Sequence, residues 1–246
     1  MHYLNKYWFK KGGLSLLSRV SEFLLGFLVF MMMTRLYTKE LFGVWVLFST
    51  YTILIEIVRT NFVQNSFVKF FVSAESYEKN RVFTSALILN ITITLISIGI
   101  FYAASGFSSV FFKMPQLDSM LKLYCLVMFF SIPFTQFVLL MQARYDFKGI
   151  FISQVFRILV FFGFILFHFI SGEAPLLKNL VITQFVTALF ASLLSFLLTR
   201  EKSTLKLEFD KGITFKMFSF SKYLMGTSLV SMLSNSIDKF IMGYFL

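Results

Sequence analysis

Five ionisable side chains lie inside long apolar stretches, and their spacing could build a charged lining for a cavity. They form two pairs, each three residues apart, and one isolated arginine: Arg19 with Glu22, Glu56 with Arg59, and Arg157. A charged side chain at the centre of a membrane helix costs about 2.5–3.5 kcal/mol on insertion scales, so such residues usually face a bundle interior or a watery cavity. We therefore expect a hydrated cleft whose three arginines outnumber two glutamates.

A structural explanation of the same charges stays open. Residues three apart share a helix face, so each pair could neutralise itself and only hold helices together. Arg157 has no acidic neighbour in its own apolar stretch, and this favours the cavity for the set as a whole.

Polar stripes on several stretches support the cavity. A helical spacing of three and four residues places each set on one face. The sets are Thr52, Glu56 and Arg59; Ser153, Gln154 and Arg157; Thr183, Gln184 and Thr187; and Ser228, Ser231, Asn235 and Asp238, with Lys239 next to the last.

The composition identifies the elements that must position these residues. Of the 246 residues 57% are hydrophobic and only 14% are charged, and the mean hydropathy is +0.78. A soluble domain carries about 45–50% apolar and 25% charged residues. The sequence therefore predicts an all-α polytopic membrane protein. Cys125 is the single cysteine, and no Walker motif is present, so we expect neither a metal site nor a cofactor.

Runs of about 20 apolar residues, the length that crosses a bilayer, predict six spans and the start of a seventh. They are 14–36, 42–64, 82–103, 119–141, 149–170 and 179–199, with the seventh beginning near 224–231 and reaching the last residue. Pro133 should kink the fourth span. The segment 200–222 should form in part an amphipathic helix on the membrane surface.

The net charge of +11 is attributed to topology, and we expect no nucleic-acid partner. Fourteen lysines and arginines flank the spans on the side of the N-terminus, against five on the other side. The positive-inside rule then places the N-terminus in the cytoplasm.

A short internal repeat suggests how the chain is organised. Residues 22–29 (EFLLGFLV) align without gaps to 239–246 (KFIMGYFL), with six spans between the copies. An even number of spans gives parallel repeats, related by an axis along the membrane normal. We expect residues 1–222 to form one six-helix lobe and residues 223–246 to begin a second, so that the sequence is a fragment.

With this pattern in place, the chain resembles the oligosaccharide flippases. These are polysaccharide-biosynthesis transporters of the multidrug/oligosaccharidyl-lipid/polysaccharide superfamily. Three segments carry the resemblance: 11–54 (KGGLSLLSRVSEFLLGFLVFMMMTRLYTKELFGVWVLFSTYTIL), 141–162 (MQARYDFKGIFISQVFRILVFF) and 234–246 (SNSIDKFIMGYFL).

The resemblance implies a function and a set of partners. It implies export of undecaprenyl-diphosphate-linked oligosaccharide by alternating access, in the bacterial inner membrane, by a monomer that contacts membrane lipid and candidate polysaccharide-assembly proteins. It implies that Arg19, Arg59 and Arg157 bind the diphosphate, because a guanidinium can hold two phosphate oxygens at once. The remaining polar residues would line the cavity or couple transport to protons: Glu22, Glu56, Asn235, Asp238 and Lys239.

Two other functions stay open. A drug or cation antiporter of the same superfamily would need unpaired carboxylates, whereas both glutamates have an arginine three residues away. A membrane enzyme acting on lipid-linked sugars would need a carboxylate pair, or a histidine with an aspartate, near a membrane face. The acids of the predicted outer loops are scattered, so we expect no enzyme.

Overall fold

The computed structural model describes residues 2–200, 206–223 and 226, and this part of the chain contains helices and no strand. A short further helix covers 211–223. The predicted seventh span, with Asn235, Asp238 and Lys239, lies outside the described residues. The seven long helices are α1 (His2–Leu36), α2 (Lys39–Ser73), α3 (Lys79–Phe111), α4 (Pro115–Phe130), α5 (Ile132–Ala143), α6 (Phe147–Ser171) and α7 (Leu177–Arg200).

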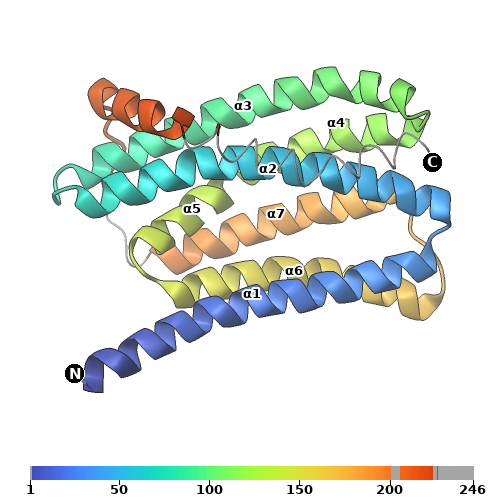
Figure 1. Ribbon diagram of the computed structural model, residues 1–246, viewed down its shortest axis with the longest axis horizontal. Coiled ribbons are helices and arrows are strands. Elements are labelled where there is room, and N and C mark those ends of the chain that lie inside the picture. The colour runs from blue at the N-terminus through green and yellow to red at the C-terminus, as the bar shows by residue number, and fades with distance from the viewer. Residues whose placement is uncertain (1, 201–205, 224–225, 227–246) are drawn as a thin grey trace.

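Five of these helices are long and apolar enough to cross a membrane, and the bent pair α4 and α5 brings the number to six. The helices run side by side along the longest axis of the molecule (Figure 1). The prediction of an all-α polytopic membrane protein is confirmed, and the chain is a multi-pass membrane protein.

Several helices extend well beyond the predicted spans. α2 continues to Ser73 rather than ending near 64, and α3 continues to Phe111 rather than 103. Hydropathy marks the stretch that can lie in hydrocarbon, whereas a helix ends where capping groups and turns end it. The hydroxyl of Thr38 accepts a hydrogen bond from the Leu41 amide at the start of α2. The carboxylate of Asp146 accepts one from the Gly149 amide at the start of α6.

The fourth span is broken, as Pro133 predicts. α4 ends at Phe130, α5 begins at Ile132, and the two are bent by 46°. Proline lacks a backbone N–H and fits only the first turn of a helix, which is where Pro133 lies in α5. At the break, the Ser131 hydroxyl and the Met128 carbonyl both accept from the Arg59 guanidinium, which is described below.

Packing divides the bundle into two apolar clusters. One joins α4 to parts of α1, α2, α6 and α7, with Phe48, Leu117 and Met128 at its centre. The other joins α2, α3 and α5 around Phe67 and Leu140, and includes Met217 from the helix at 211–223. α1 packs mainly against α6 and makes few contacts with α2. A polar cleft lies between α1 and α6 on one side and α2 and α5 on the other.

Candidate functional site: a charged cleft within the bundle

The cleft consists of two adjacent chambers that share part of their lining. The near chamber has a volume of about 310 Å³ and lies toward the end of the bundle where α1 begins. The deep chamber has a volume of about 680 Å³ and lies further along α6 and α7. Glu22, Phe134, Gln154 and Arg157 line both chambers, so this group of four residues forms the boundary between them.

The near chamber is lined mostly by polar side chains from four helices. Arg19 and Glu22 come from α1, Glu56 from α2 and Arg157 from α6. Four of the five charged residues that the sequence singles out therefore line one cavity. Further polar residues complete the lining: Ser15, Ser18, Thr60, Gln64, Thr135, Gln142 and Gln154.

Arg157 is the cation that faces both chambers. Its guanidinium carbon lies 5.3 Å from the centre of the Phe134 ring, in a cation–π arrangement. The ion pairs of the described residues do not include Arg157. A guanidinium held on an aromatic face keeps its N–H groups for other acceptors. Arg157 can therefore offer several donors to an anion in the cleft.

Arg19 and Glu22 do not neutralise each other. No ion pair joins them in the part of the chain that the structure describes. The hydroxyl of Ser18 lies 3.4 Å from Oε1 of Glu22 and donates to Oε1 of Gln154 at 3.0 Å, which links α1 to α6. Arg19 is exposed and Glu22 is half-buried. On α1, the two charges therefore line the cavity rather than form a helix-stabilising pair.

Arg59 lies elsewhere, which differs from the prediction that it lines the cavity. Its side chain is only 2% exposed, and it is not part of either chamber wall. Its five N–H groups all have acceptors within the protein. Nε and Nη2 donate to Oε2 of Glu56 at 3.3 and 2.7 Å, Nη2 also to Ser131 Oγ at 3.1 Å, and Nη1 to Thr94 Oγ1 and the Met128 carbonyl at 3.2 Å each.

The break between α4 and α5 explains this placement. At the break, the Met128 carbonyl accepts from Arg59 and from the Ser131 hydroxyl, and Ser131 Oγ itself accepts from Arg59. The sequence left open that the charged pairs only hold helices together, and this explanation applies to Arg59. Glu56 both lines the near chamber and pairs with Arg59. One carboxylate oxygen binds Arg59, while the other accepts from the Tyr124 hydroxyl at 3.1 Å.

The deep chamber adds residues that the sequence did not single out. Phe161 stacks on Trp45 with ring centres 6.1 Å apart, and Tyr124 packs edge-on against Phe48 at 5.7 Å. Among the 36 phenylalanines of the sequence, no spacing distinguishes the ones that face a cavity. The polar stripe on the sixth predicted span did identify Gln184 and Thr187, which line this chamber.

Gln184 carries an unsatisfied polar group. Its Oε1 atom is buried and has no hydrogen-bond partner in the described structure. A buried acceptor without a partner costs about 1–3 kcal/mol. A ligand with hydroxyl or amide donors in the deep chamber would offset that cost.

Fold and cleft together define a multi-pass membrane protein with a charged internal site between its helices. Residues 32–246 match the profile of a family described as polysaccharide biosynthesis protein, and the chain belongs to this family. No curated protein and no solved structure matches it.

Proposed function

We propose that this protein exports lipid-linked oligosaccharide, carried on undecaprenyl diphosphate, across the membrane by alternating access. The observation that carries the proposal is Arg157, a cation that faces both chambers with no carboxylate in ion-pair distance among the described residues. The family supplies the link to polysaccharide synthesis.

The two chambers suit the two polar parts of such a substrate. Arg157 and Arg19 in the near chamber can bind diphosphate oxygens, since guanidinium groups make strong, often bidentate hydrogen bonds to phosphate. Gln154 and Gln184 offer amide groups, which both donate and accept, to sugar hydroxyls in the deep chamber. The Thr187 hydroxyl donates to the Thr183 carbonyl and offers an acceptor there. Glu22 beside the cations can lower their combined attraction enough to allow release.

The membrane setting follows the charge bias of the sequence. We propose that the membrane is the bacterial inner membrane and that the near chamber opens to the cytoplasm, where the positive-inside rule places the N-terminus. We also propose that residues 1–222 form one lobe of a two-lobe transporter of the multidrug/oligosaccharidyl-lipid/polysaccharide superfamily, and that a second lobe beginning near 223 provides the facing wall.

A transport assay tests the proposal. The protein is reconstituted into liposomes with a fluorescent oligosaccharide linked to a polyprenyl diphosphate, and the fraction of label that crosses the bilayer is followed in time. The wild type should speed crossing, and Arg157→Gln should slow it at least about tenfold, since a hydrogen bond to a charged group contributes about 1.5–3 kcal/mol.

Arg35→Gln is the matched control, because Arg35 is exposed at the other end of α1 and lines neither chamber. It should transport like the wild type. Equal rates with and without wild-type protein would exclude flipping of this substrate. Proton-dependent export of cationic drugs by the same liposomes would then favour the antiporter.

A membrane enzyme is the less favoured alternative. In the cleft, Glu56 is bound by Arg59 and Tyr124, and Glu22 is close to Ser18. These contacts leave neither carboxylate arranged with a second acid for proton transfer.

A further inference from the structure

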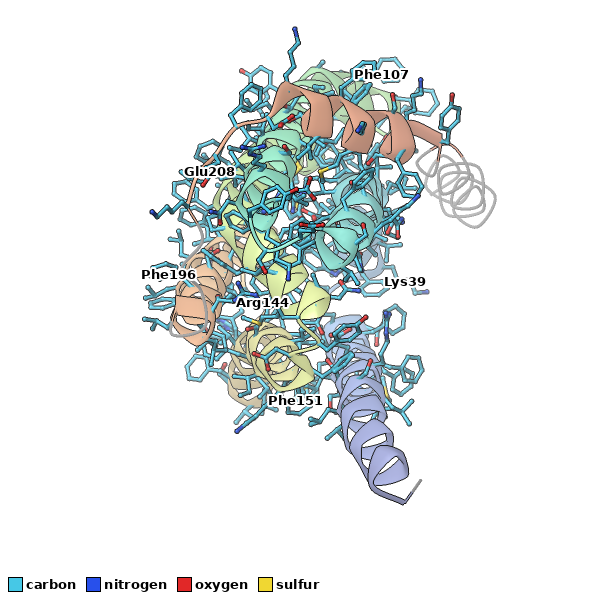
Figure 2. All side chains as sticks on the ribbon, turned by 90° about the vertical axis from the view of Figure 1, so that its left-hand side faces the viewer. Lys39, Phe107, Arg144, Phe151, Phe196 and Glu208 are labelled. Atoms are coloured by element: carbon cyan, nitrogen blue, oxygen red, sulfur yellow. The ribbon has the colours of Figure 1, made fainter. Side chains whose placement is uncertain are left out.

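The segment 206–223 forms a surface feature that the proposed transport does not use. Residues 211–223 are helical and lie at the end of the bundle where α1 begins. In Figure 2, which looks along the bundle from that end, the long helices are seen nearly end-on, whereas this helix lies across them. Because this helix crosses α2 and α3 near one end of the bundle, it has the orientation of an interfacial helix, parallel to the membrane surface.

Specific polar contacts hold residues 206–210, which precede this helix, on the start of α3. The Asn80 side chain donates to Glu208 at 3.0 Å and accepts from the Lys206 amide, while Thr84 accepts from the Glu208 amide at 2.9 Å. Arg81 forms ion pairs with Glu208 and Asp210 at 3.7 and 3.8 Å. The only two carboxylates of this described segment therefore share one cation of the bundle, which offsets one of their two negative charges.

The inner face of the helix is held by apolar and hydroxyl contacts. Met217 is fully buried in the cluster formed by α2, α3 and α5. Phe218 packs on Phe62 with ring centres 5.8 Å apart, and the Thr214 hydroxyl donates to Ser85 at 2.9 Å. Asp210 caps the helix by accepting from the Ile213 amide at 2.9 Å. The helix therefore has a fixed orientation on the bundle, and so does its outer face.

That outer face combines lysines with large apolar side chains. Lys211, Lys216 and Lys222 are all exposed. Phe215 is 68% exposed and Tyr223 72%, and Phe209 just before the helix is 64% exposed. Lysine beside exposed aromatic residues on one helix is typical of segments that insert their rings among lipid headgroups and attract anionic lipids.

We propose that the helix at 211–223 binds the headgroups of anionic phospholipids at the bilayer surface. The three lysines would attract the phosphates, and Phe209, Phe215 and Tyr223 would enter the boundary between headgroups and acyl chains. Arg81 lies within ion-pair distance of both Glu208 and Asp210. With Lys211, Lys216 and Lys222 it makes four cations against these two carboxylates, so the net charge of this surface is positive. The proposal depends on this surface and not on what the cleft transports.

Quenching by brominated lipid measures the binding directly. Phe215→Trp places a tryptophan on the outer face, with Trp8→Phe and Trp45→Phe removing the other two. The protein is placed in nanodiscs that contain brominated phosphatidylglycerol or brominated phosphatidylcholine at equal mole fractions. The anionic lipid should bind at least about fivefold more strongly, the factor that a single lysine near an anionic surface contributes.

Changing Lys211, Lys216 and Lys222 to glutamine should bring the ratio of the two binding constants close to one. The matched control changes Lys39, Lys113 and Lys178, three exposed lysines outside this surface, and should leave the ratio unchanged. Equal quenching by both lipids, selectivity that survives the triple substitution, or absence of quenching by either lipid would each overturn the proposal.

Discussion

Arg59 and Arg157 are both arginines in apolar helices, yet the structure gives them opposite surroundings. Arg59 is 2% exposed, and protein acceptors occupy all five of its N–H groups. Arg157 is half-buried, lies over the Phe134 ring and faces both chambers of the cleft. One guanidinium is part of the internal framework, and the other is available to a ligand.

The difference shows why a buried charge is not by itself evidence of a binding site. A buried ion pair whose hydrogen bonds are complete is costly to break but offers nothing to a substrate. A cation that keeps unused donors beside a cavity can bind a ligand and contributes little to folding. Substitutions at the two positions should therefore separate stability from transport.

The largest expected effect is on stability, at Arg59. Arg59→Met leaves Glu56 in a half-buried site without a countercharge, and the free energy of unfolding should fall by about 3–5 kcal/mol. Thermal unfolding of the detergent-solubilised protein measures this change. Arg59→Lys should recover only part of the loss, because an ammonium group has three donors where the site uses five.

A double substitution sharpens the same prediction. Glu56→Leu with Arg59→Met removes both charges, and replacing a buried ion pair by apolar residues is often close to neutral. The double variant should unfold at a higher temperature than Arg59→Met alone. If it unfolds at the same temperature, the stabilising role of Arg59 comes from its contacts with Thr94, Ser131 and Met128 rather than from Glu56.

The next effect is on ligand affinity, at Arg157. Arg157→Gln should unfold within about 1 kcal/mol of the wild type, because the cation–π contact with Phe134 is the interaction lost. Its affinity for a soluble polyprenyl diphosphate analogue should fall about 10- to 150-fold, from the 1.5–3 kcal/mol of a hydrogen bond to a charged group. The shift in unfolding temperature at increasing ligand concentration reports this affinity. A large loss of stability without ligand would place Arg157 in the same class as Arg59.

A smaller effect on stability is expected at Tyr124, which lines the deep chamber and binds Glu56, the partner of Arg59. Its hydroxyl donates to Oε1 of Glu56, the carboxylate oxygen that Arg59 does not bind. Tyr124→Phe removes one hydrogen bond and should lower the free energy of unfolding by about 1 kcal/mol. Tyr51→Phe, at another tyrosine whose hydroxyl accepts from Ser108, is a control away from the cleft. Chemical denaturation of both variants compares them, and a loss near zero for Tyr124→Phe would mean that Glu56 finds another donor.

The sequence predicts the helical fold and much of the cleft. Particular residues show which parts of the site it does not predict. Spacing placed Arg19, Glu22, Glu56 and Arg157 on faces that do meet, because helical periodicity and depth in the membrane fix which residues share a layer. Pro133 correctly marked the break in the fourth span. The same spacing could not separate Arg59 from Glu56, since a long side chain can turn toward a neighbouring helix.

The surroundings of Arg59 depend on tertiary contacts that no local pattern encodes. Thr94 lies 35 residues away and Ser131 lies 72 away. The aromatic walls of the deep chamber were missed for a related reason. Phe134 and Phe161 do not differ in type from the phenylalanines that face lipid, and only the packing of α5 and α6 assigns them to the cavity.

The smallest predicted effect tests whether Phe134 positions Arg157. Phe134→Leu keeps an apolar side chain on α5 but removes the ring face on which the guanidinium lies, a contact that contributes about 0.5–1 kcal/mol. We expect a two- to fivefold lower affinity for the diphosphate analogue, with the unfolding temperature little changed. Phe134→Tyr keeps the ring face and should bind like the wild type. In the Arg157→Gln background, Phe134→Leu should have no further effect on affinity, because the ring would then have no cation to hold. A further loss in that background would mean that Phe134 contacts the ligand itself.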